Sequence, residues 1–581
     1  MKMNHFKRIF SILVISYLFI PMCDVKNPTE DVNVIIKTDP ITTIVSGIIV
    51  DARTDEPIQD RVEITVEGQN QQDVISLSGS KQTEFITENG VIAFALTEQT
   101  SPSENNPVEL IVQATVSGYL PNTLRLDLVE TGSKTFKIYL INLSNSPPGV
   151  AVTTGQFQTD ENGIVQEDVV IKAIEPVTGG TAELNIPQGI QIKDDNDNPL
   201  TGMLNVLFVY NSNQTDESLN TFPGGFAVTA NRDGVIQEGI FITGGWTTTL
   251  ITDQNGSQAS SLKSSLKANS AILKSDLNEL TANVKLPISA NTYNPETSDF
   301  VKVGDLIDIW RYYSDPRIYL NEWRLTSNQV VQASNGGDLF VSFPIQIYTR
   351  EYYVHNYDVL IEIVPQMCFQ IKLVILGNEK RYPLLIRTKL ANGTGYLSTI
   401  NNVIDEVNFI RTGAPDIPFI IEAYSDCGNE KAMFGSVVVS DFCSDNEIYL
   451  NVTVSDIDIT HKTIQVSGYC SCLSGMIVRP SGIPIWYQNT SCGSGSWIFA
   501  GIANDGEIEM DGLHIGATYI FLAYYEGRIY RMAATIHADY SVYAPEFSTQ
   551  NYIKEVNVDG DVIEYVVQLP DEACVSLCDQ Y

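Results

Sequence analysis

Positive charge is scarce in this chain. Of its 581 residues, 35 are Lys or Arg and 70 are Asp or Glu, which gives a formal net charge of −35. Proteins that bind nucleic acid present a basic face, so this balance argues against a nucleic-acid partner. It also argues against contact with a membrane through a polybasic surface. An acidic surface keeps an exposed protein soluble and can offer sites to cations.

Long apolar runs and histidines are also few. Beyond the first 22 residues there is no run of about 18 apolar residues, so we expect the remainder to be soluble. The histidines are His5, His355, His461, His514 and His537. None of them begins an H-x-x-E or H-E-x-x-H sequence, which argues against a zinc peptidase.

Markers of other catalytic classes are missing as well. There is no G-x-S-x-G nucleophile elbow, and CGSGSW at 492–497 has the wrong spacing. No glycine loop of the phosphate-binding kind occurs. The 70 acidic residues allow many carboxylate pairs, so a glycoside hydrolase stays open as an alternative. We predict that the chain is not an enzyme and has no catalytic residue.

The N-terminus carries an export signal. Lys2, Lys7 and Arg8 precede an apolar run, 9–22, that is too short to span a membrane comfortably. The run ends in LFIPMC and is followed by Asp24, which resembles a bacterial lipoprotein signal. The resemblance implies a signal peptide over 1–22, a lipid on the thiol of Cys23 and a tether over 23–44. The alternative is an ordinary signal peptide with Cys23 as a plain thiol.

Short alternating strands begin at residue 45. In VSGIIVDARTDEPIQDRVEITVEG, 45–68, apolar residues alternate with polar ones on both sides of a turn at 54–60, which predicts strands of a half-buried sheet. Asn89-Gly90 predicts a hairpin, because both residues tolerate a positive φ. The segment 108–128 predicts two more strands around Gly118-Tyr119.

Residues 45–142 resemble the carboxypeptidase regulatory-like domain, a seven-stranded transthyretin-like sandwich. The matching residues are Gly47, Asp51, Thr54, Glu56, Pro57, Ile58, Thr87, Asn89, Gly90, Gly118 and Tyr119. The resemblance implies an accessory module without chemistry of its own, of the kind found on surface lipoproteins, notably in Bacteroidota.

The following 200 residues divide by composition. Strand and turn patterns continue over 150–255, where GGTAELNIPQGIQI, 179–192, resembles the start of ZU5-like β domains. Leucines at near-helical spacing predict a connector helix or a polar linker over 256–285, with a partner-docking helix as the sharper alternative. An aromatic-rich β segment covers 286–358.

Two further sandwiches are predicted over 359–455 and 456–581. The segments 406–425 and 507–525 repeat the order of 91–119: a short strand, a turn and a second strand that ends near tyrosine. NDGE, 504–507, takes the place of TENG, and VSG at 45–47 recurs at 466–468. We interpret both units as diverged copies of the first. The predicted fold class is therefore all-β, a string of immunoglobulin-like or transthyretin-like sandwiches.

Two side-chain groups are candidates for ligand binding. Carboxylate and amide oxygens gather in DDNDN, 194–198, and are ligands that calcium prefers. The segment lacks the later glycine and glutamate of an EF-hand, so a solvated hairpin turn is the favoured explanation. The candidate calcium ligands are Asp194, Asp195 and Asp197; no other cofactor is expected. A second group could stack on sugar rings or contact a protein, or could simply fill a core. It consists of Trp310, Tyr312, Tyr313, Tyr319 and Trp323.

Apart from Cys23, all cysteines lie in the second half of the chain. An even number in an exported chain predicts disulfides, but eight cysteines allow 105 pairings. A zinc site at the close pairs 470–472 and 574–578 is the rival, although both lack the usual spacer. The candidates are Cys368, Cys427, Cys443, Cys470, Cys472, Cys492, Cys574 and Cys578.

The leading hypothesis is a non-catalytic protein of the cell envelope, held by a lipid anchor in the outer membrane or at the cell surface, or facing the periplasm. It would bind, adhere or scaffold, with an unknown protein or glycan as ligand. One alternative is an accessory subunit of an outer-membrane uptake or secretion complex. The other is a surface glycan hydrolase with an unrecognised carboxylate pair.

Overall fold

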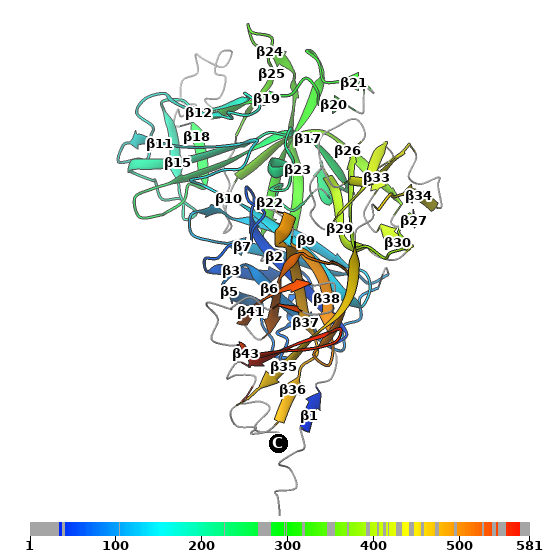
Figure 1. Ribbon diagram of the computed structural model, residues 1–581. Helices are drawn as coiled ribbons and strands as arrows, with labels where there is room; N and C mark the ends of the chain where they lie inside the picture. Colours follow the sequence, from blue (N-terminus) through cyan, green and yellow to red (C-terminus); the bar gives the residue numbers. More distant parts are fainter. Residues whose placement is uncertain are drawn as a thin grey trace, which may run out of the picture.

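The structure is a computed structural model. It describes residues 34–574 except 38–40, 104, 226, 265–280, 295–296, 298, 316–319, 346–354, 369–370, 391–395, 404–405, 411–413, 416–417, 426–432, 441–446, 455–457, 471–475, 493–496, 526–527, 537–541, 544–552 and 570–573. Nearly all of the described elements are strands (Figure 1), which confirms the all-β class. The helix α2 (Asp216–Leu219) is a single turn that begins with a side-chain cap by Thr215.

Residues 43–142 form the first sandwich. One sheet has the order β4 (Val74–Ile75), β6 (Val91–Leu96), β2 (Thr43–Asp51), β10 (Gly132–Asn142) and β8 (Tyr119–Leu120). The other has the order β5 (Glu84–Thr87), β3 (Val62–Glu67), β7 (Val108–Thr115) and β9 (Asn122–Leu128). The first strand, β2, pairs in parallel with the last, β10. This is the seven-stranded sandwich that the resemblance implied, with β4 and β8 added at its edges.

The next region is a single two-sheet domain rather than two units. One sheet has the order β12 (Val169–Ile174), β13 (Thr181–Ile186), β19 (Asn283–Ile288), β25 (Leu339–Pro344) and β24 (Gln332–Ala333). The other has the order β11 (Val150–Thr159), β15 (Gly202–Asn211), β17 (Val235–Thr252), β16 (Ala227–Arg232), β23 (Leu320–Val330), β22 (Leu306–Asp315), β26 (His355–Cys368) and β31 (Ala414–Pro415). One core cluster contains side chains from Ala151 to Ile345, so the predicted units 150–255 and 286–358 share a core.

This domain also contains two short two-stranded ribbons. Five strands of its larger sheet form a closed ring of paired strands. The ribbons pair β14 (Ile190–Lys193) with β18 (Ser261–Ser264) and β20 (Tyr293–Asn294) with β21 (Asp299–Phe300). β17 also pairs with β26, so the order β17-β16-β23-β22-β26 returns to β17. The predicted connector 256–285 therefore has strands at both ends, β18 and β19. Its middle, 265–280, lies outside the described residues.

The second sandwich covers 371–451. Its sheets have the orders β30 (Val407–Ile410), β27 (Ile371–Leu376), β34 (Glu447–Asn451), and β29 (Tyr396–Val403), β28 (Leu384–Leu390), β32 (Phe419–Tyr424), β33 (Met433–Val439). It starts later than the predicted residue 359, because β26 belongs to the sheet of the preceding domain.

The last sandwich covers 459–568. β39 (Glu507–His514), β35 (Ile459–Tyr469), β44 (Val562–Gln568) and β43 (Ile553–Asp559) form one sheet, which β36 (Met476–Arg479) and β1 (Val34–Lys37) extend. β38 (Ile498–Ala503), β37 (Ile483–Asn489), β40 (Thr518–Tyr525), β41 (Arg528–Ile536) and β42 (Val542–Tyr543) form the other. β1 pairs with β36, so part of the predicted tether 23–44 is a strand.

The three sandwiches share one topology. In each of them the first strand pairs in parallel with the last: β2 with β10, β27 with β34 and β35 with β44. The first strand also receives the fourth strand on its other side, β6, β30 or β39. The second strand lies between the third and the fifth in every case. This common order supports the interpretation of the later units as copies of the first.

A recurring hydrogen bond marks equivalent positions in the three copies. The turn before the fourth strand crosses from one sheet to the other and offers a carbonyl to the first strand. The bonds are Ile49 N–H to the Gly90 carbonyl (2.7 Å), Ile375 N–H to that of Glu406 (2.8 Å) and Val466 N–H to that of Gly506 (2.7 Å). Asn89 and Gly90 do have positive φ, 71° and 66°. They nevertheless join strands of different sheets, so the predicted hairpin is wrong.

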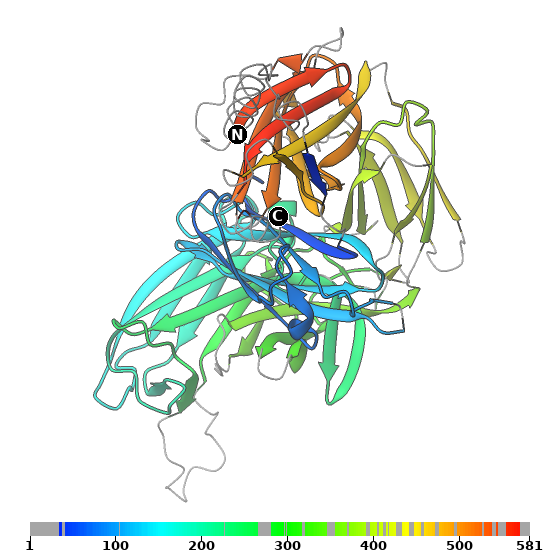
Figure 2. The same cartoon turned by 90° about the horizontal axis from the view of Figure 1, so that it is seen from below.

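The first and last sandwiches pack against each other. Their side chains belong to one core cluster, which includes Ile48 and Phe94 of the first and Trp486 and Leu522 of the last. Figures 1 and 2 both show the orange and red strands of the last sandwich beside the blue strands of the first. This cover explains why β2 and β6 are buried on both faces, where the sequence pattern predicted a half-buried sheet.

Polar contacts fix the alignment of these two sandwiches. The Trp486 indole N–H donates to the Ser46 hydroxyl over 2.9 Å. Glu56 accepts from the Gln488 amide (2.8 Å) and from the Trp497 indole N–H (3.2 Å). The two indole N–H groups and the Gln488 amide each have an acceptor at this apolar interface, as buried donors require.

Candidate functional site

The described members of the predicted aromatic group, Trp310, Tyr312 and Trp323, do not form an exposed stacking surface. Trp310 of β22 and Trp323 of β23 are 0% and 1% exposed and lie in one cluster with Phe222 and Trp246. Tyr312 packs on Trp323 with ring centroids 5.1 Å apart, and its hydroxyl is 2.7 Å from that of Thr123 in the first sandwich. These rings therefore fill a core at a domain junction. Tyr319 and the side chain of Tyr313 lie outside the described residues.

The acidic loop at 194–198 is a tight, internally bonded turn. The Asp194 carboxylate accepts from the backbone N–H groups of Asn196 (2.9 Å) and Asn198 (2.7 Å) and from the Asn198 amide (3.0 Å). Slight burial would raise the pKa of Asp194, but the hydrogen bonds from Asn198 and Asn196 outweigh it and lower that pKa. Asp197, at φ 62°, pairs with Lys193.

The same turn recurs at two other places in this domain. Asp160 accepts from the N–H groups of residues 162 and 164, and Asp253 from those of residues 255 and 257. Within the described ranges, no three His, Cys, Asp or Glu side chains form a group that could hold a metal ion. Calcium at Asp194, Asp195 and Asp197 stays a prediction.

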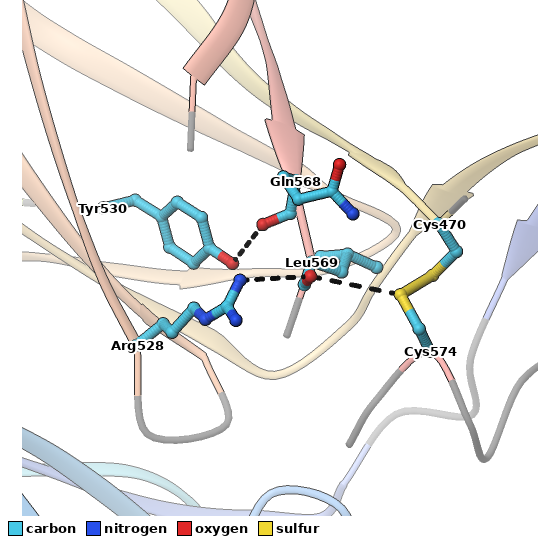
Figure 3. Close-up of a disulfide and its surroundings, with 6 residues drawn as sticks. All are labelled: Cys470, Arg528, Tyr530, Gln568, Leu569 and Cys574. Atoms are coloured by element: carbon cyan, nitrogen blue, oxygen red, sulfur yellow. Dashed lines mark hydrogen bonds between the residues drawn. A yellow bond between two sulfur atoms is a disulfide. The ribbon is translucent and has the colours of Figure 1, made fainter. Parts of the chain in front are cut away.

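The cysteines include a long-range disulfide. Cys470, at the end of β35, is bonded to Cys574, with Cα atoms 5.5 Å apart and 104 positions between them in the chain. Figure 3 shows two hydrogen bonds that hold the end of β44 near this disulfide. The Tyr530 hydroxyl donates to the Gln568 carbonyl, and the Arg528 guanidinium donates to the Leu569 carbonyl. Cys492 is also disulfide-bonded. The Cys470–Cys574 bond uses two of the sulfurs that the alternative zinc site would need.

Residues of the regulatory-like motif build the first turn of the first sandwich. The Asp51 carboxylate accepts from the N–H groups of Arg53 (2.8 Å) and Thr54 (3.2 Å) and from the Tyr119 hydroxyl (3.1 Å). Burial and the neighbouring Asp51 carboxylate raise the pKa of Tyr119. Together with Glu56 at the interface with the last sandwich, these residues have structural roles.

A groove that the sequence analysis missed lies on the two-sheet domain. It has a volume of about 510 Å³, within the range of ligand sites, and lies on the outer face of β11, β15 and β17. Strand register arranges its side chains in two rows. Gln156, Asn205 and Thr252 form a polar row, and Thr154, Leu207 and Leu250 form the row beside it.

The groove is open, its described lining carries no charge, and it lies beside the contact with the first sandwich. Its polar row is linked by a bond of 2.8 Å from the Gln156 amide to the Asn205 carbonyl. Behind the second row, Val152 and Val209 pack against Leu120 and Ile141 of the first sandwich. The alternating strand pattern could have indicated these outward positions, but not that the three strands lie side by side in one sheet.

The remaining predicted site, Cys23, lies outside the described residues. In the part of the chain that the structure describes, no helix is long and apolar enough to cross a membrane.

Comparisons with known proteins give distant structural likenesses. No family model matches the chain, and no curated protein matches it. The chain is similar to the major pilin subunit BcpA of Bacillus cereus, at 9% identity over 90% of this chain and 99% of that one, with a TM-score of 0.12. It is also similar to the Bacillus anthracis TIE protein (9%, 92% and 75%, TM-score 0.12) and to the major pilin SpaD of Corynebacterium diphtheriae (9%, 91% and 97%, TM-score 0.13).

TM-scores this low carry no argument about function. The fold class rests on the strands and sheets described above. Membership of the first sandwich in the regulatory-like family stays a prediction.

Proposed function

We propose that the chain is a non-catalytic, lipid-anchored protein of the cell envelope that presents a rigid binding surface. The observation that carries this proposal is the open groove on β11, β15 and β17, which lies on paired strands beside the contact with the first sandwich. A rigid sheet holds side chains at fixed spacing, so binding there loses little conformational entropy.

The packing of the domains supports a scaffolding role. The last sandwich covers the first, and the first also contacts the two-sheet domain through Thr123 and Tyr312. A chain with these contacts is a compact assembly of β domains rather than beads on flexible linkers. The lipoprotein-like N-terminus supports anchoring at Cys23, because two or more acyl chains hold a protein stably in a bilayer.

Fractionation of the native envelope tests the anchor. We expect the full-length chain in the membrane fraction and Cys23→Ser in the soluble exported fraction, with the same Tm. If Cys23→Ser stays with the membrane, the lipid anchor is wrong. Protease treatment of intact cells then assigns the surface or the periplasmic side.

A crosslinked pull-down from the same envelope tests stand-alone binding. A stoichiometric outer-membrane partner would favour the alternative hypothesis, an accessory subunit of a membrane complex. Release of reducing sugar from polysaccharide by the purified chain would favour the glycan-hydrolase hypothesis.

A further inference from the structure

The groove on β11, β15 and β17 has a chemistry that selects its ligand. Its described lining contains amides, hydroxyls and leucines, and none of these described residues is charged, although the whole chain carries 105 charged residues. A charged ligand would lose hydration here without gaining an ion pair, which disfavours it. The lining therefore fits a neutral ligand.

The polar row can bond neighbouring hydroxyl groups. The Gln156 amide nitrogen already donates to Asn205, which leaves the Gln156 oxygen as an acceptor and the Asn205 nitrogen as a donor. Within the described residues neither atom has a further side-chain partner. Thr252, opposite Asn205 in the register, adds a hydroxyl to the row.

The second row supplies an apolar strip that runs parallel to the polar row. Leu207 and Leu250 are cross-strand neighbours and both are partly exposed. A sugar ring has hydroxyls at its edge and C–H groups on its faces, so it can contact both rows at once. Protein partners usually place Trp, Tyr or Arg at the centre of an interface, and the lining offers none of these.

We propose that this groove binds an uncharged polysaccharide, with Gln156, Asn205 and Thr252 bonding its hydroxyls and Leu207 and Leu250 contacting its ring faces. The inference rests on the proposed binding function and names its ligand class. It places the glycan on β11, β15 and β17, away from the aromatic group at 310–323.

Affinity electrophoresis of the full-length exported chain tests the proposal. The probes are neutral soluble glucan, mannan and xylan, with polygalacturonate and alginate as acidic comparators. We expect retardation by at least one neutral polysaccharide. The double variant Gln156→Ala/Asn205→Ala should weaken binding about tenfold or more, because two hydrogen-bonding groups are lost.

Two further variants separate binding from folding. Thr154→Trp fills the groove from an exposed strand position that tolerates an aromatic residue, and should weaken binding by a similar factor with an unchanged Tm. Gln158→Ala is the matched control, because Gln158 is an exposed glutamine on the same strand outside the lining, and it should bind like the parent chain.

Three results would overturn the proposal: no neutral polysaccharide binds, only the acidic ones bind, or binding survives both groove variants. A peptide that binds the parent chain but not the groove variants, while no glycan binds, would also overturn the proposal and would favour a protein ligand. Failure of the proposed function looks different, since it appears as Cys23→Ser retained in the membrane or as sugar release by the parent chain.

Discussion

Glu175 illustrates how one buried carboxylate organises a turn. It is 1% exposed and accepts from the N–H groups of Gly149 and Val177 (both 3.1 Å), from that of Thr178 and from the Thr178 hydroxyl (2.7 Å). Burial alone would raise the pKa of Glu175, but the hydrogen bonds from Thr178, Val177 and Gly149 outweigh it and hold that pKa below its ordinary value of 4.5.

Replacing this carboxylate should produce a pH-dependent loss of stability. A lowered pKa stabilises the fold above pH 4.5, and this stability is lost as the pH falls through the folded-state value. We expect Glu175→Gln to cost about 1–3 kcal/mol at pH 7 and much less near pH 3. Urea unfolding at both pH values measures this, with the exposed Glu167→Gln as control. Equal losses at pH 7 and pH 3 would contradict the role of the charge.

At the scale of elements, the crossing turn makes two glycines equivalent. Gly90 and Gly506 have φ of 66° and 74°, and a Cβ on either would lie 2.4 Å from a carbonyl oxygen of the first strand, that of Ile49 or Val466. Gly79 and Gly516 also have positive φ, but a Cβ there would meet nothing within 4 Å. Substitution of Gly79 and Gly516 therefore tests backbone strain alone, and substitution of Gly90 and Gly506 tests backbone strain together with the contact between Cβ and the carbonyl oxygen.

Alanine scanning of these four glycines should divide them into two classes. We expect Gly79→Ala and Gly516→Ala to cost about 1 kcal/mol, from the left-handed backbone alone. Gly90→Ala and Gly506→Ala should cost about 2–3 kcal/mol, because the carbonyl must also move. The change in the free energy of unfolding is the measurement. A single common value for all four would refute the effect of the close carbonyl, and different values for Gly90→Ala and Gly506→Ala would refute their equivalence.

The sequence predicts elements where their determinants are local. Asn89-Gly90 and NDGE at 504–507 fix a turn by backbone chemistry, so the position of a turn before the fourth strand was predicted in the first and last sandwiches, although the sheet that each strand joins was not. The repeated VSG was misleading. The shared hydrogen bond makes Ile49 and Val466 equivalent positions in the two copies, so Gly47 is equivalent to Ile464 and not to Gly468. A strand pattern of period two cannot set register between distant segments.

Sites at domain junctions could not be predicted in the same way. Trp310 and Trp323 look alike in sequence whether they face solvent or a neighbour, and here Phe222 and Trp246 cover them. The groove at Gln156 and Asn205 depends on the pairing of β11, β15 and β17, three strands that are separated in the chain. Both features are set by packing between segments far apart in the chain, which the alternation within one strand does not encode.

At the scale of the whole molecule, the closure of the last sandwich on the first should make the two unfold together. Trp486 is the central contact: it is 1% exposed, packs into the core cluster of the first sandwich and bonds Ser46 across 440 residues. Its neighbour Tyr487 points to the opposite face of β37 and is buried in the core of the last sandwich itself. The pair allows a matched comparison of interface and interior.

Hydrogen exchange in the full-length chain can read the two sandwiches separately. Trp486→Ala and Tyr487→Ala should each cost about 3–5 kcal/mol, as expected for removing a large buried aromatic side chain. Trp486→Ala should speed exchange in β2 and β6 of the first sandwich as well as in β37, because their shared core loses its centre. Tyr487→Ala should affect β37 and β40 and leave β2 and β6 protected, because the first sandwich keeps its apolar cover. If both variants confine faster exchange to the last sandwich, the first is stable without its neighbour, and the assembly is a chain of independent domains.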